Sequence, residues 1–282
     1  MLAELLGAPP HDPDVVDFVA AQRCGSVAIL SLARPEQHNV INLAGWRRIG
    51  ELARMWAADP SVRVVLLRGV GDRAFGTGAD IKEFPQTRMT AATAVQYNEA
   101  VAHALGAVAS IPVPVVAVIA GLAVGGGLEL SAAADVRLAS DRARFGLPIG
   151  RLGVTLGLTE AACLSRLIGP SALKYLIFSG ELVDAAEAQR MGLVQRVVPA
   201  SDLVAAAVSL AESVTHASLP TLLAAKAVAD MTTRTLTAED TEVLARITVE
   251  VYPGPDLAEG VEAFLDRRPP QFPSRATGEG DL

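Results

Sequence analysis

The chain has 282 residues, 51% of them hydrophobic and 20% charged, and its 24 glycines and 17 prolines are scattered rather than repeated. This composition excludes disordered, collagen-like and low-complexity proteins, and it fits one large α/β domain or two smaller ones. The formal net charge of −7 argues against a general nucleic-acid or anionic-membrane surface, so neither partner is expected.

The N-terminal segment and the cysteines bear on the cellular compartment. Residues 1–13 lack the basic and apolar regions of a secretory signal, and we expect them to form a flexible tail. Cys24 and Cys163 lie far apart without a CxxC pattern, which indicates neither a disulfide framework nor a structural zinc site. A cytoplasmic location is therefore expected.

The first predicted elements are a hairpin and an amphipathic helix. Two apolar runs, residues 15–21 and 26–32, are separated by Arg23-Cys24-Gly25, as in a turn between antiparallel strands. Asn42 can cap a following helix, which extends to Trp56 with apolar residues at helical spacing.

Strands and helices then alternate, which is the pattern of an α/β core. The stretch between Glu99 and Glu129 carries no formal charge and is long enough to cross a bilayer. Pro112, Pro114 and four glycines interrupt it, so we predict a buried strand at 115–119 instead of a membrane span. The other elements predicted here are strands at 62–67 and 136–139 and helices at 90–108 and 128–134.

From Thr159 onward the chain is predicted to be mainly helical, with one strand at 194–198. We expect an α/β core over residues 14–200, a helical C-terminal region over 201–270 and a mobile tail over 271–282. The predicted helices span 159–168, 170–178, 184–191, 202–215, 220–231, 238–251 and 256–265.

A glycine cluster between a predicted strand and a predicted helix is the first candidate site. Gly121, Gly125, Gly126 and Gly127 let a ligand approach the backbone, and the first N–H groups of a helix have no internal partner. Glu129 would return to the face of these N–H groups and could move protons beside a stabilised oxygen anion. The alternative is a glycine-rich turn with a solvated glutamate.

A second cluster, residues 74–83, again combines glycines with a turn after a strand. The N–H group of Ala79 could be a second donor. Two donors that converge from separate loops stabilise an enolate or a tetrahedral anion, and removing one donor costs about 3–4 kcal/mol.

The order of these motifs resembles the enoyl-CoA hydratase/isomerase (crotonase) superfamily, and the match covers nearly the whole chain beyond the N-terminal tail. It rests on motifs that occur in one order: Arg34-Pro-Glu-Gln-His-Asn39-Val-Ile-Asn42, Phe75-Gly-Thr-Gly-Ala79-Asp80, Pro114-Val-Val-Ala-Val-Ile-Ala-Gly121, Gly125-Gly-Gly-Leu-Glu129, Ala134-Asp135-Val-Arg137 and Phe145-Gly-Leu-Pro148.

The resemblance implies an α/β fold with a crotonase-like ββα spiral core and a helical C-terminal region, assembled as a homotrimer or a dimer of trimers. It implies an acyl-coenzyme A thioester as substrate, with no metal or redox cofactor. The N–H groups of Ala79 and Gly126 would hold the thioester oxygen, with Glu129 as the acid–base group. The positions implied for coenzyme A or substrate binding are His38, Asn39, Val40, Gly78, Asp80, Ile81, Lys82 and Gly125.

The chain departs from the family pattern at Ile149, where hydratases of this family carry a second glutamate. Losing one of two proton-handling groups lowers a rate by about 10²–10⁴-fold. Glu160 is a possible substitute, but an acid in the first turn of a helix is more often an electrostatic partner of the helix terminus. Arg151 could stabilise an enolate or pair with an acid. Hydration, double-bond isomerisation and acyl-CoA binding without turnover therefore all stay open.

Overall fold

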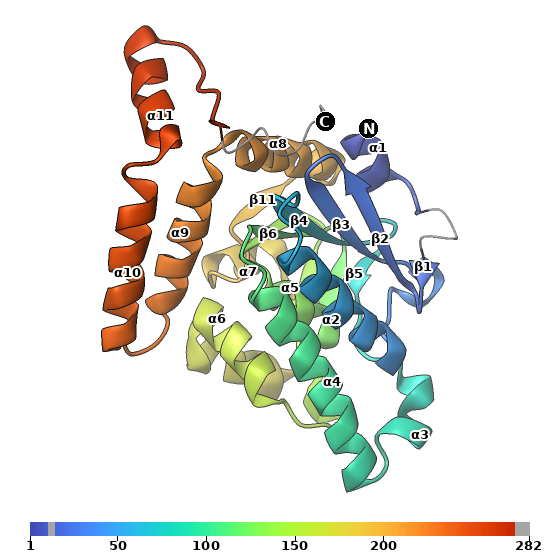
Figure 1. The fold of residues 1–282 in the computed structure, drawn as a ribbon. Coiled ribbons are helices and arrows are strands. Elements are labelled where there is room, and N and C mark those ends of the chain that lie inside the picture. Colours follow the sequence, from blue (N-terminus) through green and yellow to red (C-terminus); the bar gives the residue numbers. More distant parts are fainter. Residues whose placement is uncertain (11–14, 274–282) are drawn as a thin grey trace.

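The computed structural model describes residues 1–10 and 15–273. A seven-stranded sheet lies at its centre, in the order β1-β2-β3-β4-β6-β8-β11 (Figure 1). Strands β1 to β3 pair antiparallel, and the pairs from β3 to β11 are parallel. The strands are β1 Val15–Val16, β2 Val19–Cys24, β3 Val27–Leu32, β4 Val64–Gly69, β6 Val115–Ile119, β8 Val136–Ser140 and β11 Arg196–Val198.

A second, smaller sheet runs beside the first, in the order β10-β9-β7-β5. The chain passes from a strand of the large sheet to a strand of the small sheet and then to a helix, three times in succession. The ββα spiral core is thus confirmed. The strands are β5 Ala74–Gly76, β7 Leu122–Val124, β9 Arg144–Gly146 and β10 Val183–Asp184; the helices that follow β5, β7 and β9 are α3 Phe84–Thr87 with α4 Ala91–Ala109, α5 Gly126–Ala133 and α6 Leu158–Ser179.

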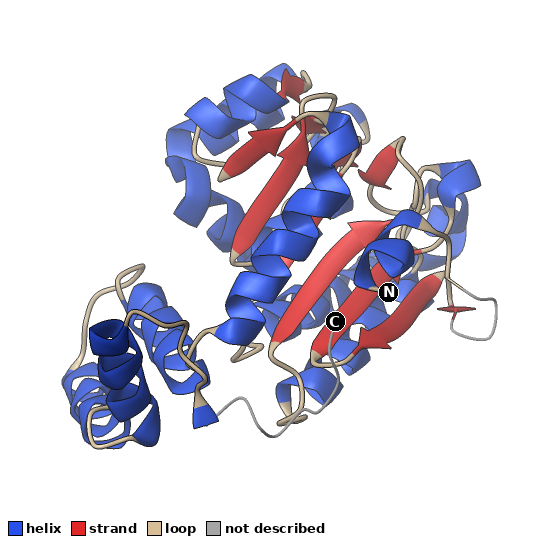
Figure 2. Cartoon of the chain, turned by 90° about the horizontal axis from the view of Figure 1, so that it is seen from above, coloured by secondary structure: helices blue, strands red, loops and turns tan. Residues whose placement is uncertain are grey.

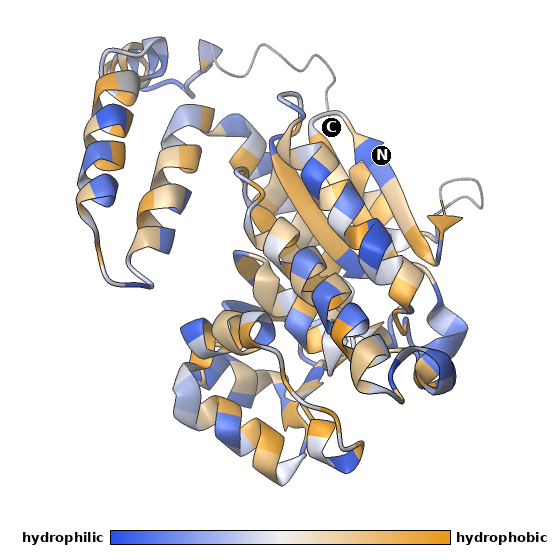
Figure 3. Ribbon diagram, turned by 60° about the horizontal axis from the view of Figure 1, so that its bottom comes forward, coloured by the Kyte–Doolittle hydropathy of each residue, from blue (hydrophilic) through white to orange (hydrophobic). Residues whose placement is uncertain are grey.

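The large sheet is buried on both faces. Because alternate residues of each strand point to opposite faces, one strand contributes side chains to two hydrophobic clusters. In β3, Ala28 and Leu30 belong to the cluster formed with helices α2 (Leu43–Ala57), α4, α5 and α6, whereas Val27 and Ile29 belong to a second cluster. The helices thus lie on both sides of the strands (Figure 2), whose hydrophobic residues form the centre of the molecule (Figure 3).

Of the flexible tail predicted over residues 1–13, residues 2–8 are ordered by contacts with the core, and residues 11–13 lie outside the described residues. Residues Leu2–Gly7 form helix α1, whose Leu2 and Leu6 are buried in the second cluster beside helix α8 (Leu203–His216). The buried guanidinium of Arg68 on β4 donates to the carbonyls of Leu6 and Ala8 at 2.5 and 2.6 Å. These bonds satisfy a buried cation, so the tail is fixed by the sheet beneath it.

Helix α6 contains the two helices that the sequence predicted separately, since Gly169 has a left-handed φ of 73° and Pro170 follows it. Its length and hydropathy also pass a test for a membrane-spanning helix, as do α8 and α9 taken as one bent pair. The break at Gly169 interrupts this helix, and one face of it packs against α4 and α5, while only 22% of the apolar window is buried.

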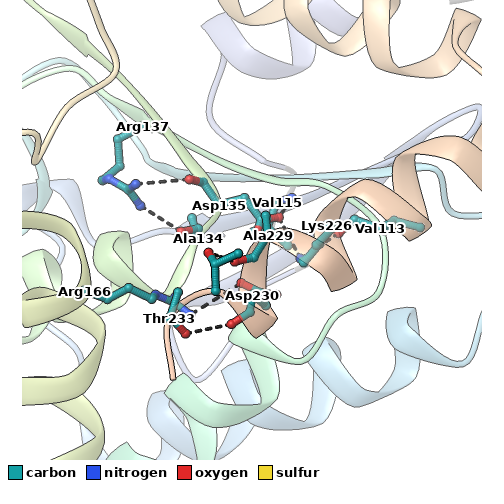
Figure 4. Close-up of polar contacts among 11 residues, drawn as sticks. Val113, Val115, Ala134, Asp135, Arg137, Arg166, Lys226, Ala229, Asp230 and Thr233 are labelled. Atoms are coloured by element: carbon teal, nitrogen blue, oxygen red, sulfur yellow. Dashed lines mark hydrogen bonds and ion pairs between the residues drawn. The ribbon is translucent and has the colours of Figure 1, made fainter. Parts of the chain in front are cut away.

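The C-terminal helices α9 Leu219–Met231, α10 Ala238–Val251 and α11 Pro255–Asp266 extend away from the sheets (Figure 1). Figure 4 shows how α9 is attached: the Lys226 ammonium donates to Asp135 Oδ2 at 2.6 Å and to the carbonyl of Val113 at 3.1 Å. Arg137 is fully buried and donates to the carbonyl of Ala134 at 2.8 Å. The Ala134-Asp135-Val136-Arg137 motif therefore has a structural role: it holds helix α9 and the end of α5 in place.

The C-terminal tail predicted over residues 271–282 is described only in part. Residues 271–273 lie against α11, where the Gln271 N–H donates to Glu259, and the rest lie outside the described residues.

Replacing Leu6 by alanine tests the packing of helix α1. Because Leu6 is buried, Leu6→Ala should lower the free energy of unfolding by about 2 kcal/mol, the lower end of the range for core leucines. The matched change of the exposed Glu4, Glu4→Ala, should leave it nearly unchanged. Urea denaturation measures both, and equal stability of the two variants would show that the helix is not docked.

Candidate active site

A cavity of about 100 Å³ lies between the spiral core and helices α2, α4 and α6. It collects residues from both glycine clusters and from the first turn of α6. Aromatic and aliphatic side chains make up much of its wall, with few polar groups among them, which is typical of a small-molecule site. Its lining residues include Trp46, Gly78, Ala79, Ile81, Phe84, Arg88, Tyr97, Gly125, Gly126, Glu129, Ile149 and Glu160.

The two glycine clusters are in direct backbone contact. Gly78 has a φ of +93°, and a Cβ atom there would lie 3.0 Å from the nitrogen of Gly126. A Cβ atom on Gly127 would lie only 2.0 Å from the carbonyl oxygen of Gly76. Side chains at these positions would force the loops apart, so the glycines permit the close approach that the sequence analysis expected.

Ala79 and Gly126 both line the cavity beside this junction. The neighbours of Ala79 pair with Ile41: the Gly78 carbonyl accepts from Ile41 N at 2.8 Å, and Asp80 N donates to the Ile41 carbonyl at 3.0 Å. Gly126 is the first residue of α5, where an amide has no partner within the helix. Among the described residues, neither the Ala79 nor the Gly126 N–H donates to an acceptor. The cavity thus offers two free donors from separate loops.

Glu129 follows Gly126 by one helical turn, lines the same cavity and is 9% exposed. Burial and, to a smaller extent, the charge of Glu160 raise its pKa to about 8, against the opposing effect of the charge of Arg88. At neutral pH the Glu129 carboxyl therefore carries its proton. This rules out the solvated glutamate that the sequence had left as the alternative.

Glu160 lies in the cavity with Glu129. It is the third residue of α6, it is 5% exposed, and its Oε2 has no hydrogen-bond partner among the described residues. Burial raises its pKa, against the opposing effects of its own backbone N–H and of Arg88. The sequence left its role open, and the fold brings it to the candidate site.

Arg88 is a cavity residue that the sequence analysis missed. Its guanidinium stacks on Tyr97, 4.4 Å from the ring centre, and on Phe84 at 5.2 Å, and it donates to Asn98. No carboxylate of the described residues forms an ion pair with it. Arg88 lies in the loop between α3 and α4 and belongs to no motif, so no signal in the sequence pointed to it.

Ile149 and Arg151, the other two candidates for the second acid–base position, lie in different places relative to the cavity. Ile149 begins a 3-10 turn after Pro148, and both residues line the cavity. Arg151 is exposed, and its guanidinium lies against Gly180, where a Cβ atom would be 3.0 Å from its Nε. Arg151 is therefore not among the residues that line the cavity and is not placed to stabilise an anion there.

The side chains of two residues that the resemblance assigned to coenzyme binding have partners within the protein. The buried Asn39 amide donates to the carbonyls of Val70 and Ala74 at 3.1 and 2.7 Å, and its oxygen accepts from Arg34 N at 3.0 Å. Its side chain is fully used inside the protein, so it holds the loop and does not reach a ligand.

Asp80 likewise has partners within the protein. Its carboxylate accepts from Lys82 N at 3.1 Å and pairs with Arg34 Nη1 at 2.6 Å. Its role is therefore to cap the turn after Ala79. Ile81 and Lys82 are exposed beside it, and Ile81 lines the cavity. His38 and Val40 are half-buried in the adjoining loop, whose His38 carbonyl accepts from Thr77 N at 3.1 Å.

Comparison with known proteins identifies the family to which the chain is similar. Residues 22–275 match the family model of enoyl-CoA hydratase/isomerase. A Mycobacterium leprae protein named "Probable enoyl-CoA hydratase echA8" is 35% identical over 249 residues, covering 88% of this chain and 95% of that protein. The (E)-benzylidenesuccinyl-CoA hydratase of Thauera aromatica is 34% identical over 251 residues, covering 87% and 95%. Among solved structures, an enoyl-CoA hydratase/carnithine racemase from Magnetospirillum magneticum superposes with a TM-score of 0.86 at 34% identity, covering 92% and 97%.

The raised pKa of Glu129 predicts how stability depends on pH. Above the ordinary pKa of 4.5 the unfolded state ionises, whereas the folded state keeps the proton up to about pH 8. The wild type therefore loses stability between these values, and Glu129→Gln, which has no proton to release, does not. The melting temperature of the variant minus that of the wild type should grow from pH 5 to pH 8 and then level. A constant difference would show that the carboxyl is not buried in its neutral form.

Proposed function

Since the chain belongs to the enoyl-CoA hydratase/isomerase family, we propose that its cavity binds an enoyl-CoA thioester and either hydrates its double bond or moves it. The observation that carries this proposal is the junction of the two loops, where the free N–H groups of Ala79 and Gly126 meet the buried carboxyl of Glu129. The comparisons support an enzyme of this type over a protein that only binds acyl-CoA.

The two N–H groups would hold the thioester carbonyl oxygen. As a nucleophile adds to C3, or as a proton leaves the acyl chain, negative charge develops on this oxygen. Fixed donors in a site shielded from water stabilise that charge without having to reorient, and each is worth about 3–4 kcal/mol in the transition state. Both reactions of the family share this enolate.

Glu129 would move the proton. Its position one turn after Gly126 places the carboxyl beside the acyl carbons next to the held oxygen. Isomerisation needs one group that takes a proton from one carbon and returns it to another. Hydration needs a second group, and the apolar side chain of Ile149 cannot serve.

Coenzyme A would enter as part of the substrate, with no separate metal or redox cofactor. Its nucleotide and phosphates would lie outside the cavity along the loop of His38 and Val40, with the exposed Lys82 at the mouth as a partner for a phosphate. The exposed Ile81 and the glycines Gly78 and Gly125 would contact the part of the substrate that enters the cavity.

We further propose a trimer or a dimer of trimers in the cytoplasm. Apolar side chains are exposed on the C-terminal helices: Val249 on α10 and Phe264 and Leu265 on α11 are each more than 70% exposed. Apolar side chains so exposed are typical of surfaces that another chain covers. Cys24 and Cys163 are free thiols buried in different clusters, which suits a reducing compartment.

Turnover of a panel of 2-enoyl- and 3-enoyl-CoA thioesters tests the function. The wild type should hydrate or isomerise at least one of them, and Glu129→Gln should lower kcat by about 10²–10⁴-fold. Because backbone groups hold the substrate, calorimetric titration of the variant should show acyl-CoA affinity within about tenfold of the wild type. Full turnover by Glu129→Gln would remove this residue from the mechanism, and binding without turnover by the wild type would favour a carrier.

Sedimentation velocity at micromolar concentration tests the assembly. The expected mass is that of three or six chains, and Phe264→Asp should shift it towards smaller species because a charge would have to be buried at the contact. A wild type that sediments as a monomer contradicts the proposed assembly.

A further inference from the structure

We propose that Glu160, at the start of α6, is the second acid–base residue of this enzyme, so that Glu129 and Glu160 together hydrate the enoyl thioester. This inference rests on the function proposed above and decides between its two reactions. In hydratases of the family, the second acid–base residue is a glutamate at the position of Ile149. Here that role would fall to Glu160 on α6.

The placement of Glu160 is the first argument. It lines the cavity that holds Glu129 and the two free N–H groups, although 30 residues lie between the two glutamates in the chain. The residue is only 5% exposed, yet its Oε2 lacks a hydrogen-bond partner among the described residues. A buried carboxyl oxygen without a partner is costly, and a bound water or substrate in the cavity would satisfy it.

The fit of its carboxyl group is the second argument. The carboxyl folds back over Gly157, where a Cβ atom would lie 2.2 Å from Oε2 and 2.8 Å from Oε1. Any larger residue at position 157 would displace it. Glycine at this position therefore leaves room for the carboxyl at the cavity wall.

A comparison with another helix separates this arrangement from ordinary stabilisation of a helix terminus. Glu187 occupies the same third position of helix α7 (Ala185–Arg190). Its side chain is 35% exposed and forms an ion pair with Arg190. Glu160 has no such ion pair among the described residues and is buried. Its carboxyl interacts with its own backbone N–H at the helix terminus, but Oε2 is left without a partner in the cavity, so stabilisation of the terminus accounts for only part of its placement.

The charges around the two carboxyls suit shared proton handling. The negative charge of Glu160 raises the pKa of Glu129, and Arg88 lowers the pKa of both. The Cys163 thiol on α6 lies near both carboxyls: burial raises its pKa most, and the charges of Glu160 and Glu129 add to this effect against those of Arg166 and Arg137. Two neighbouring carboxyl groups tend to hold one proton between them, and the cation of Arg88 favours ionisation of the other.

One proton on the pair is what hydration requires. The ionised carboxylate takes a proton from water as the water oxygen bonds to C3, and the electron pair of the double bond passes to the thioester as an enolate. The carboxylic acid then gives its proton to C2, and the enolate returns to a thioester. The product is the 3-hydroxyacyl-CoA, and the pair again holds one proton.

The experiment compares the wild type with Glu160→Gln and with Glu187→Gln as the matched control. Both substitutions keep a residue that suits the third position of a helix, so melting temperatures should stay close to that of the wild type. Hydration of a short 2-enoyl-CoA should fall about 10²–10⁴-fold in kcat for Glu160→Gln, with KM changed far less, and should not change for Glu187→Gln. A wild type that turns over no enoyl-CoA overturns the proposed function and this inference with it. An active wild type with an equally active, folded Glu160→Gln overturns this inference alone.

A second measurement does not depend on activity. The protein is labelled with ¹³C at its glutamate carboxyls and titrated by NMR. The Glu129 signal is assigned as the one that is absent from the spectrum of Glu129→Gln. Its titration midpoint should fall in Glu160→Gln, because the neighbouring negative charge is gone, and should stay in place in Glu187→Gln. An unchanged midpoint in Glu160→Gln would mean that the two carboxyls are not neighbours, and it would overturn the proposal.

Discussion

The close approach of two backbone segments is the constraint on which the site depends. The turn after β5 and the start of α5 touch through main-chain atoms, which is possible only because Gly76, Gly78, Gly126 and Gly127 carry no side chains. This contact joins two successive turns of the spiral. It holds the amides of Ala79 and Gly126 in place before any substrate arrives, and such preorganisation is what makes backbone donors effective. Asn39 and Asp80 serve the same end, since their side chains fix the loops that flank Ala79.

The same contact determines the electrostatics of the cavity. Helix α5 begins at the junction and carries Glu129 into an interior where the carboxyl keeps its proton at neutral pH. Helix α6 brings Glu160 to the same interior, and Arg88 reaches it from the opposite loop, supported by Tyr97 and Phe84. Burying two carboxyls costs stability, and the fold tolerates this cost where the groups serve chemistry.

The sequence predicted the long strands, most helices and both glycine clusters, because each has a clear period or an apolar run long enough to detect. Strands β5, β7 and β9 have three residues each, too few for a periodic signal, so the alternation was seen without the second sheet. Helix α1 was missed because it is held by contacts with distant segments, namely the burial of Leu2 and Leu6 in the second cluster and the hydrogen bonds from Arg68 on β4. The resemblance pointed to the loop of Asn39, but it did not show that the Asn39 side chain turns inward to bind backbone carbonyls of the protein. Arg88 and the meeting of Glu160 with Glu129 depend on packing between segments far apart in the chain, which local patterns do not encode.

The vibrational frequency of a bound thioester carbonyl tests the central claim most directly. An acyl-CoA with a ¹³C-labelled carbonyl would be bound to Glu129→Gln, which does not turn it over, and its stretch identified by the isotope shift in an infrared difference spectrum. If the amides of Ala79 and Gly126 hold the oxygen, the band lies at lower frequency than in water, because two fixed donors polarise the C=O bond more than mobile solvent does. A band at or above its frequency in water would contradict the account, since the oxygen would then lie away from the junction of the two loops.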